Sequence, residues 1–463
     1  MRALFPDDRC SNRNSDTEAI EAAALADAHH VRSVGGIEEY RLLANDLRVL
    51  FLPWRAAPVA LTMLTYRVGS RHETHGIKGG SHMLEHLMFK GTERFNKPDG
   101  TSIHDLLHPV GGIANATTWL DRTNYFDLVP NDHAAIAAEI EADRMRHLRI
   151  DPDELESERS VVLNEHDLYA GDPLERLNQA VWAAAFSQHP YGEPVIGTRD
   201  DIAGLTCERL LEHYDAHYWP DNATLTVIGD LQRAQALELA QKYFAPISAG
   251  RRIYEARCDE EPEQREERRV TTTQSGQPGW LMLAYKSPEG THPDADALDV
   301  LGRILAGGAC TRADASLVAT GLASSVWCSV SRLARPGLFQ AQAFLGDCGA
   351  NDAAERALRD AIDDIRRHGV SQDELDLAKG RIRGQTLTSR DGPVAIALQL
   401  NEAIAAGDWT AYPAAAERIA AVSVDDVRRV ARHYLRDERL TVGHLVGGDA
   451  RDAEPLSLRA SAA

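Results

Sequence analysis

The chain repeats part of its own sequence at a separation of about 216 residues, which constrains its fold more than any other feature. Residues 202–206 (IAGLT) precede residues 217–227 (HYWPDNATLTV), and residues 419–423 (IAAVS) precede residues 433–442 (HYLRDERLTV), one residue shorter. Segments that recur in the same order indicate a duplicated unit. At 463 residues the chain is also too long for one ordinary core. We therefore predict two duplicated α+β domains.

Charge composition predicts where these two domains are joined. Residues 248–269 are rich in charged residues and poor in apolar ones, a composition typical of an exposed linker. We expect a mobile N-terminal extension at 1–32, a first domain at 33–247, a second domain at 270–447 and a tail at 448–463. In each domain we expect a mainly antiparallel sheet packed with helices.

Short apolar runs and turn residues predict the elements of each half. In the first half we expect strands near 40–44, 47–52, 59–67, 113–119, 123–129 and 222–229, and helices at 80–90, at about 99–108 and over most of 131–218. In the second half we expect strands near 270–286, 323–331, 337–345 and 439–446, and helices at 292–306, 312–320 and onward to about 434.

The string His82-Met-Leu-Glu85-His86, or H-x-x-E-H, carries the clearest chemical signal. Residues four apart share one face of a helix, so His82 and His86 can direct their imidazoles at one metal ion. Two neutral imidazoles suit Zn²⁺, and the Glu85 carboxylate beside them can take a proton from metal-bound water. The order reverses that of the zincin motif. The alternative is a surface helix with two solvated histidines, and a third ligand would decide between the two.

Two glutamates later in the chain are candidates for the third ligand. Glu158 and Glu165 are seven residues apart, or two helical turns, so they lie near one face of a helix. One carboxylate can bind the metal, and the other can accept the second N–H of a ligand histidine and fix its tautomer. The alternative is an amphipathic helix with two exposed glutamates.

Composition excludes several classes of protein. The net charge of −20 argues against nucleic acid and anionic membranes as partners, and no apolar run is long enough to span a membrane. The N-terminus lacks the apolar core of a signal peptide, so we expect a cytoplasmic protein, or a periplasmic one if the start codon is wrongly assigned. Six scattered cysteines read as free thiols in a reducing compartment: Cys10, Cys207, Cys258, Cys310, Cys328 and Cys348.

Several motifs together resemble the pitrilysin-type inverzincin zinc metallopeptidases, which include insulin-degrading enzyme and mitochondrial processing peptidase. The resemblance covers roughly residues 35–445, and its length and single linker are similar to the two-domain subfamily with bacterial members, in which two subunits form a closed chamber. The matching segments occur in the family's order: Gly69–Glu73, Gly80–Thr92, Val110–Ala116, Glu158–Glu165 and His189–Thr198.

The resemblance implies roles for five side chains. His82, His86 and Glu165 would bind one zinc ion per chain, because only the first half carries the H-x-x-E-H string. Glu85 would be the general base, and Glu158 would be the supporting carboxylate of the catalytic site.

The resemblance also implies that the segment Gly112–Thr118 is an edge strand on which the substrate lies as an added strand. Such recognition needs an unpaired edge, and the small Ala114 and Ala116 leave room for a peptide. We also count Asn115 among the candidate substrate-binding residues.

One departure from the family pattern affects the predicted assembly. The family has an Arg and a Tyr in its C-terminal half that reach the substrate, and here Leu317 and Ser324 stand at those positions. In some homologues a second chain without the zinc motif supplies these groups. We therefore expect a homodimer or a heterodimer with such a chain, unless another residue, such as Arg312 or Tyr125, substitutes.

The predicted function is that of a zinc metalloendopeptidase acting on extended peptides or small unfolded polypeptides. The alternative is a non-catalytic assembly or core subunit of a larger complex. The intact Glu85 favours the enzyme, because an assembly subunit needs no base at that position.

Overall fold

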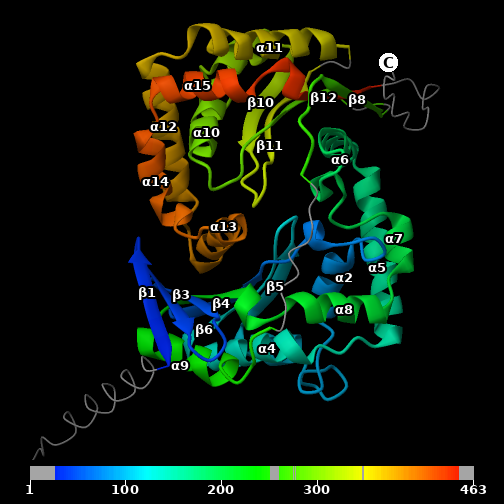
Figure 1. Cartoon of the computed structure of the whole chain (residues 1–463), viewed down its shortest axis with the longest axis vertical. Coiled ribbons are helices and arrows are strands. Elements are labelled where there is room, and N and C mark those ends of the chain that lie inside the picture. The colour runs from blue at the N-terminus through cyan, green and yellow to red at the C-terminus, as the bar shows by residue number, and fades with distance from the viewer. Residues whose placement is uncertain (1–26, 251–259, 275, 277, 347–348, 448–463) are drawn as a thin grey trace, which may run out of the picture.

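The first half of the chain builds a seven-stranded sheet, as seen in the lower part of the computed structural model (Figure 1). The structure describes residues 27–250, 260–274, 276, 278–346 and 349–447. The strand order is β1-β2-β3-β7-β4-β6-β5, and of these pairs only β3 with β7 is parallel. The strands are β1 (Ala28–Val34), β2 (Ile37–Leu42), β3 (Arg48–Pro53), β4 (Val59–Tyr66), β5 (Ile113–Thr118), β6 (Thr123–Pro130) and β7 (Ala223–Gly229).

The second half builds a five-stranded sheet that repeats this path. Its order is β10-β11-β9-β12-β8, and only β12 with β8 is parallel. The path β8-β12-β9-β11-β10 therefore matches β3-β7-β4-β6-β5 strand for strand, with the same single parallel pair, so the predicted duplication is confirmed. The strands are β8 (Arg268–Thr273), β9 (Trp280–Lys286), β10 (Ala323–Val330), β11 (Leu338–Leu345) and β12 (Leu440–Val446).

Helices cover both sheets and make the fold a mixed α+β one. Those of the first half are α2 (Gly80–Leu87), α3 (Ile103–Leu107), α4 (Ala134–His147), α5 (Pro152–Gly171), α6 (Pro173–Ala185), α7 (Arg199–Gly204), α8 (Cys207–His217) and α9 (Arg233–Phe244). Those of the second half are α10 (Pro293–Leu305), α11 (Asn351–His368), α12 (Gln372–Thr388), α13 (Pro393–Ala406), α14 (Ala411–Ala421) and α15 (Val424–Tyr434).

The two halves exchange one helix each. Helix α6 packs on the second sheet, where Leu177 and Val181 join a buried cluster with Met282. Helix α13 packs on the first sheet, where Ile396 buries its side chain against Met63. Figure 1 shows α6 beside β8 and β12, and α13 between the halves. Each half thus supplies part of the other's hydrophobic core.

The first sheet begins earlier than predicted. Residues 28–32 fall in the range predicted as a loose extension, but they belong to β1, which pairs with β2 through a turn at Gly35 and Gly36, both at positive φ. Only Ala28 of β1 is buried, so the strand is held by backbone hydrogen bonds and has no apolar alternation that a sequence pattern could reveal. Residues 1–26 and 448–463 lie outside the described residues.

The predicted linker lies partly outside the described residues, at 251–259. Its last two residues, 268 and 269, belong to β8. The proposed domain boundaries otherwise stay a prediction. Among the helices that the structure describes, none combines the length and the apolar character needed to cross a bilayer.

Candidate metal centre

Helix α2 carries the H-x-x-E-H string and is fixed at its first turn by a buried carboxylate. The Glu73 side chain accepts hydrogen bonds from the backbone N–H groups of Gly79 and Ser81, both at 2.7 Å. Met83, Leu84 and Leu87 face the core. Because the helix is buried on that side, His82 and His86 lie on its other face, one turn apart.

Helix α5 brings the third group to this face. It begins after Asp151, whose side chain accepts from the Asp153 N–H, and it buries Leu155 and Val162. Glu158 lies on the buried side with 8% of its side chain exposed, whereas Glu165, two turns later, is 29% exposed. The accessible carboxylate is therefore that of Glu165.

His82, His86 and Glu165 converge at one point. The Glu165 Oε2 atom lies 3.7 Å from His82 Nε2 and 3.6 Å from His86 Nε2. Zinc binds N and O at about 2.0–2.2 Å, so two ligand atoms of one tetrahedral ion lie roughly 3.3–3.6 Å apart. The three groups fit a single zinc ion, and among the described residues they are the only such set of His, Cys, Asp and Glu.

The two histidines differ in their electrostatic environment. Burial, together with the neighbouring His86, lowers the pKa of His82 to about 4, so His82 is neutral at pH 7 and offers a lone pair. Burial also disfavours a charge on His86, but the carboxylates of Glu165 and Glu158 outweigh it and raise the pKa of His86. The His86 imidazole in turn lowers the pKa of the Glu165 carboxyl. Glu165 thus supplies a carboxylate to the site.

Glu158 supports one of the histidines. Its Oε2 atom lies 3.2 Å from His86 Nδ1, and its Oε1 atom pairs with the Lys90 ammonium. A carboxylate on Nδ1 leaves Nε2 of His86 free for a metal and fixes the ring orientation. The His82 Nδ1 atom is buried and has no such partner among the described residues.

Glu85 lies beside the ligand pair and is held by the edge strand. Its Oε2 atom accepts a hydrogen bond from the Thr118 hydroxyl at 2.5 Å, on β5. Burial raises the pKa of Glu85, although the bond from Thr118 opposes that shift. The carboxylate is therefore desolvated and oriented, as a base for a neighbouring water requires.

Strand β5 is the last strand of the first sheet and, within the part of the chain that the structure describes, pairs only with β6. Ala114, Ala116 and Thr118 share the face toward α2, because residues two apart in a strand lie on one side. The Asn115 side chain lies on the opposite face, is exposed, and accepts a hydrogen bond from the Ala116 N–H at 2.8 Å. The structure thus puts the predicted substrate-binding residues on an open sheet edge beside the metal site.

The two residues that stand where the family has an Arg and a Tyr lie away from this site. Leu317 is buried in the core of the second half. Ser324 lies on β10, where its hydroxyl donates to the Phe344 carbonyl at 3.2 Å. Of the two substitutes considered, Arg312 is engaged in an ion pair with Glu374 at 2.8 Å. The other, Tyr125, is fully buried with its hydroxyl 3.3 Å from that of Tyr218.

Two residues of the site were not assigned a role from the sequence. Glu73 belongs to a segment that resembles the family, and Thr118 belongs to the predicted edge strand. Both act through tertiary hydrogen bonds, Glu73 to the start of α2 and Thr118 to Glu85. Glu73 lies seven residues before α2 begins, outside its first turn, so no helix-capping pattern in the sequence identifies it.

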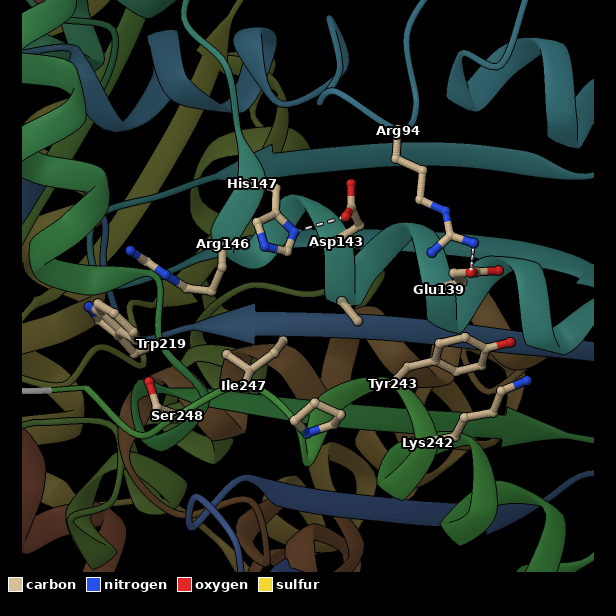
Figure 2. Close-up of a pocket in the computed structure, with 12 residues that line it drawn as sticks. Arg94, Glu139, Asp143, Arg146, His147, Trp219, Lys242, Tyr243, Ile247 and Ser248 are labelled. Carbon is tan, nitrogen blue, oxygen red and sulfur yellow. Dashed lines mark hydrogen bonds and ion pairs between the residues drawn. The ribbon is translucent and has the colours of Figure 1, made fainter.

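A surface pocket of about 600 Å³ lies elsewhere on the first half, and none of the metal-centre residues lines it (Figure 2). Arg94 pairs with Glu139, and His147 Nδ1 lies 2.8 Å from the Asp143 carboxylate (Figure 2). These four charged groups pair with one another, and the pocket does not include the candidate metal ligands. The metal centre therefore remains the candidate functional site.

Comparison with known proteins gives two family models that match successive parts of the chain. The model described as "Insulinase (Peptidase family M16)" matches residues 53–199, which contain α2 and α5. The model described as "Peptidase M16 inactive domain" matches residues 204–382. The two models belong to one family and together match more than half of the chain.

Relatives and solved structures agree with this match. The chain is 27% identical to the zinc protease PqqE of Helicobacter pylori, covering 91% of this chain and 96% of that protein. It is 24% identical to a probable mitochondrial-processing peptidase subunit beta of Arabidopsis thaliana, covering 90% of this chain and 80% of the relative.

Two solved structures share the fold. The crystal structure of a protease from Helicobacter pylori superposes with a TM-score of 0.82 at 27% identity, over 88% of this chain and 99% of that one. Pitrilysin superposes with a TM-score of 0.77 at 16% identity, over 90% of this chain and 46% of that one. The chain therefore belongs to the M16 family of insulinase- and pitrilysin-like peptidases.

Proposed function

We propose that this chain is a zinc-dependent metalloendopeptidase that hydrolyses extended peptides or small unfolded polypeptides. The observation that carries the proposal is the convergence of His82, His86 and Glu165, with the desolvated Glu85 beside them. Relatives named zinc proteases support it.

Each group of the site would have its own role in peptide hydrolysis. When bound, zinc would lower the pKa of a water molecule and polarise the scissile carbonyl. Thr118 holds the Oε2 atom of Glu85, so the Oε1 atom is the one available to accept the proton of that water. Glu85 would then donate this proton to the leaving amine.

The open edge of β5 determines the form of the substrate. A peptide that adds to this edge must be extended, because its backbone forms the hydrogen bonds of a new strand. The Asn115 side chain accepts from the Ala116 N–H at the edge. We propose that the Asn115 side chain moves away when a substrate carbonyl accepts from this N–H in its place. Because the added strand must be extended, folded proteins should be poor substrates.

We also propose that the active form is a dimer. Leu317 is buried, and the Ser324 hydroxyl is hydrogen-bonded within its own sheet. Neither position therefore provides the Arg or the Tyr that the family has in its second half. A homologous partner chain without the H-x-x-E-H string would supply an Arg and a Tyr. The relative named as a beta subunit of a processing peptidase is consistent with a subunit role.

Metal analysis and a cleavage assay test this function together. We expect one zinc ion per chain and cleavage of a quenched unstructured peptide by the wild type. Glu85→Gln should retain zinc and lose at least about 10²-fold in kcat, because only the base is removed. Activity that appears only with an added homologous chain would support the heterodimer, whereas a chain without zinc would contradict the enzyme and favour an assembly role.

A further inference from the structure

The turn between β5 and β6 carries an arginine that lies between the edge strand and the second half. Arg122 has 10% of its side chain exposed, and its Nη1 atom donates to the Thr117 carbonyl at 3.0 Å and to the Asn124 side chain at 3.1 Å. The same atom donates to the Thr117 hydroxyl at 2.5 Å. The Nη1 edge of the guanidinium thus holds the backbone of β5.

The opposite edge of this guanidinium binds the second half. Its Nη2 and Nε atoms donate to the Glu402 Oε1 atom on α13, at 2.6 and 3.1 Å. Hydrogen bonds between charged groups are stronger than neutral ones, and the low exposure of Arg122 strengthens them further. Arg122 therefore links α13 of the second half to Thr117.

Thr117 immediately precedes the residue that orients the base. The hydroxyl of Thr118 donates to Glu85 Oε2 at 2.5 Å. The path from Glu402 through Arg122 and β5 thus ends at the carboxylate that is proposed to take the proton.

Two further contacts from the second half reach the same hairpin. Asn401, next to Glu402, donates from its side chain to Asn124 Oδ1 at 3.2 Å. At the turn itself, the Asp121 carboxylate accepts from the Ala334 N–H of the second half at 2.9 Å, and also from the Tyr191 hydroxyl of the first half at 2.7 Å. The hairpin that forms the substrate edge is therefore held by α13 on one side and by the β10–β11 loop on the other.

We infer that the second half positions the β5 edge and the base Glu85 through Arg122, which acts as a positioning residue without touching the substrate. This inference rests on the proposed peptidase function for its catalytic consequence. It gives the second half, which has no metal set among its described residues, a part in catalysis beyond the burial of apolar surface.

Four variants and one control test the inference by kinetics. Glu402 is 46% exposed on a helix, so Glu402→Ala should fold even if Arg122→Met does not. We expect Arg122→Met to lower kcat by about tenfold or more with zinc content and KM little changed, and Glu402→Ala to lower it roughly three- to tenfold. The double variant should equal Arg122→Met, because Glu402 acts only through the arginine. Arg122→Lys should recover part of the loss.

The matched control breaks a contact between the halves that does not reach β5. Arg176 on α6 donates to the Gln274 side chain at 2.7 Å. Arg176→Met should leave kcat unchanged. An equal loss in this control, a loss of zinc in parallel with kcat, or additive effects in the double variant would each overturn the positioning role.

Hydrogen exchange followed by mass spectrometry tests the same link without any activity. Amides of a peptide spanning β5 should exchange faster in Glu402→Ala and Arg122→Met than in the wild type, and at the wild-type rate in Arg176→Met. Unchanged exchange in both variants would overturn the inference, as would faster exchange with unchanged kcat. If the wild type cleaves nothing, the peptidase function fails, but exchange still decides whether the second half holds the strand.

Discussion

At the scale of single residues, the structure separates two glutamates that the sequence spacing leaves equivalent. Glu165 lies within coordination reach of His82 and His86, whereas Glu158 is more buried and lies 3.2 Å from the far nitrogen of His86. The Glu158 side chain is 8% exposed and that of Glu165 is 29% exposed, so α5 presents the two carboxylates to different atoms of the histidine pair. Their roles therefore differ although their chemistry is the same.

This geometry predicts the effect of neutralising Glu158. Glu158→Gln should weaken zinc binding by about 10–100-fold, because His86 loses the carboxylate that orients its ring. Competition with a chelator measures the affinity. The control is Glu156→Gln on the same helix, whose carboxylate is 72% exposed and pairs with Arg159. Equal affinities for Glu158→Gln and the wild type would contradict the supporting role.

At the scale of elements, the short helix α2 depends on its neighbours. Eight residues are too few for a stable isolated helix, so tertiary contacts must hold it. Glu73 caps its first turn, and the Ser81 hydroxyl lies 3.0 Å from His213 Nε2 on α8. Helix α8 also carries His217, with its ring centroid 4.8 Å from that of His213. The buried His213 imidazole thus contacts α2, and the buried His217 imidazole lies beside it.

These imidazoles predict that the fold weakens in acid. Burial lowers the pKa of His213 to about 3 and that of His217 to about 4, from an ordinary value near 6.5. Between about pH 6.5 and 4 the unfolded chain binds protons that the folded chain does not, so the free energy of unfolding falls as the pH falls. Each histidine contributes at most about 1.4 kcal/mol per pH unit.

Urea unfolding at several pH values measures this dependence. His217→Phe keeps a ring of similar shape and should flatten the pH dependence below about pH 6 relative to the wild type. The exposed His147 offers a control, and His147→Gln should leave the dependence unchanged. A wild-type stability that stays constant from pH 6.5 to 4 would rule out the cost of the buried histidines.

At the scale of the whole molecule, the exchanged helices join the hydrophobic cores of the two halves. Val181 and Leu177 of α6 pack directly over Gly443 of β12, where a Cβ atom would lie only 2.4 Å from Val181 Cγ2. The absence of a side chain at this position is what lets the helix approach the sheet of the other half. The same exchange brings α13, and with it Glu402, to Arg122 in the turn between β5 and β6.

A side chain at position 443 should therefore destabilise the whole chain. Gly443→Ala is expected to lower the free energy of unfolding by about 1–3 kcal/mol, because neither Val181 nor the sheet can move away freely. Thermal unfolding measures the change. The control position, Gly380, lies on an exposed part of α12, where a Cβ would meet no atom within 4 Å. Gly380→Ala should leave the free energy of unfolding unchanged or raise it by about 0.5–1 kcal/mol. Matching melting temperatures for Gly443→Ala and the wild type would contradict the close approach.

The sequence by itself determined the features that depend on local spacing or on repetition. The separation of His82 and His86 gives one face of a helix with Glu85 beside it, whatever surrounds that helix. The recurrence of residues 202–227 at 419–442 indicated two similar units, and two sheets of matching strand order followed.

Only the tertiary structure decided the contacts between segments far apart in the chain. It brought Glu165 to the histidines, Thr118 to Glu85, and Glu402 to Arg122 across 280 residues. It also added β1, which backbone pairing holds without an apolar pattern. Periodicity encodes which face of an element is buried, but it does not encode which distant face covers it, because many apolar surfaces can pack together and specific polar contacts form only after they do.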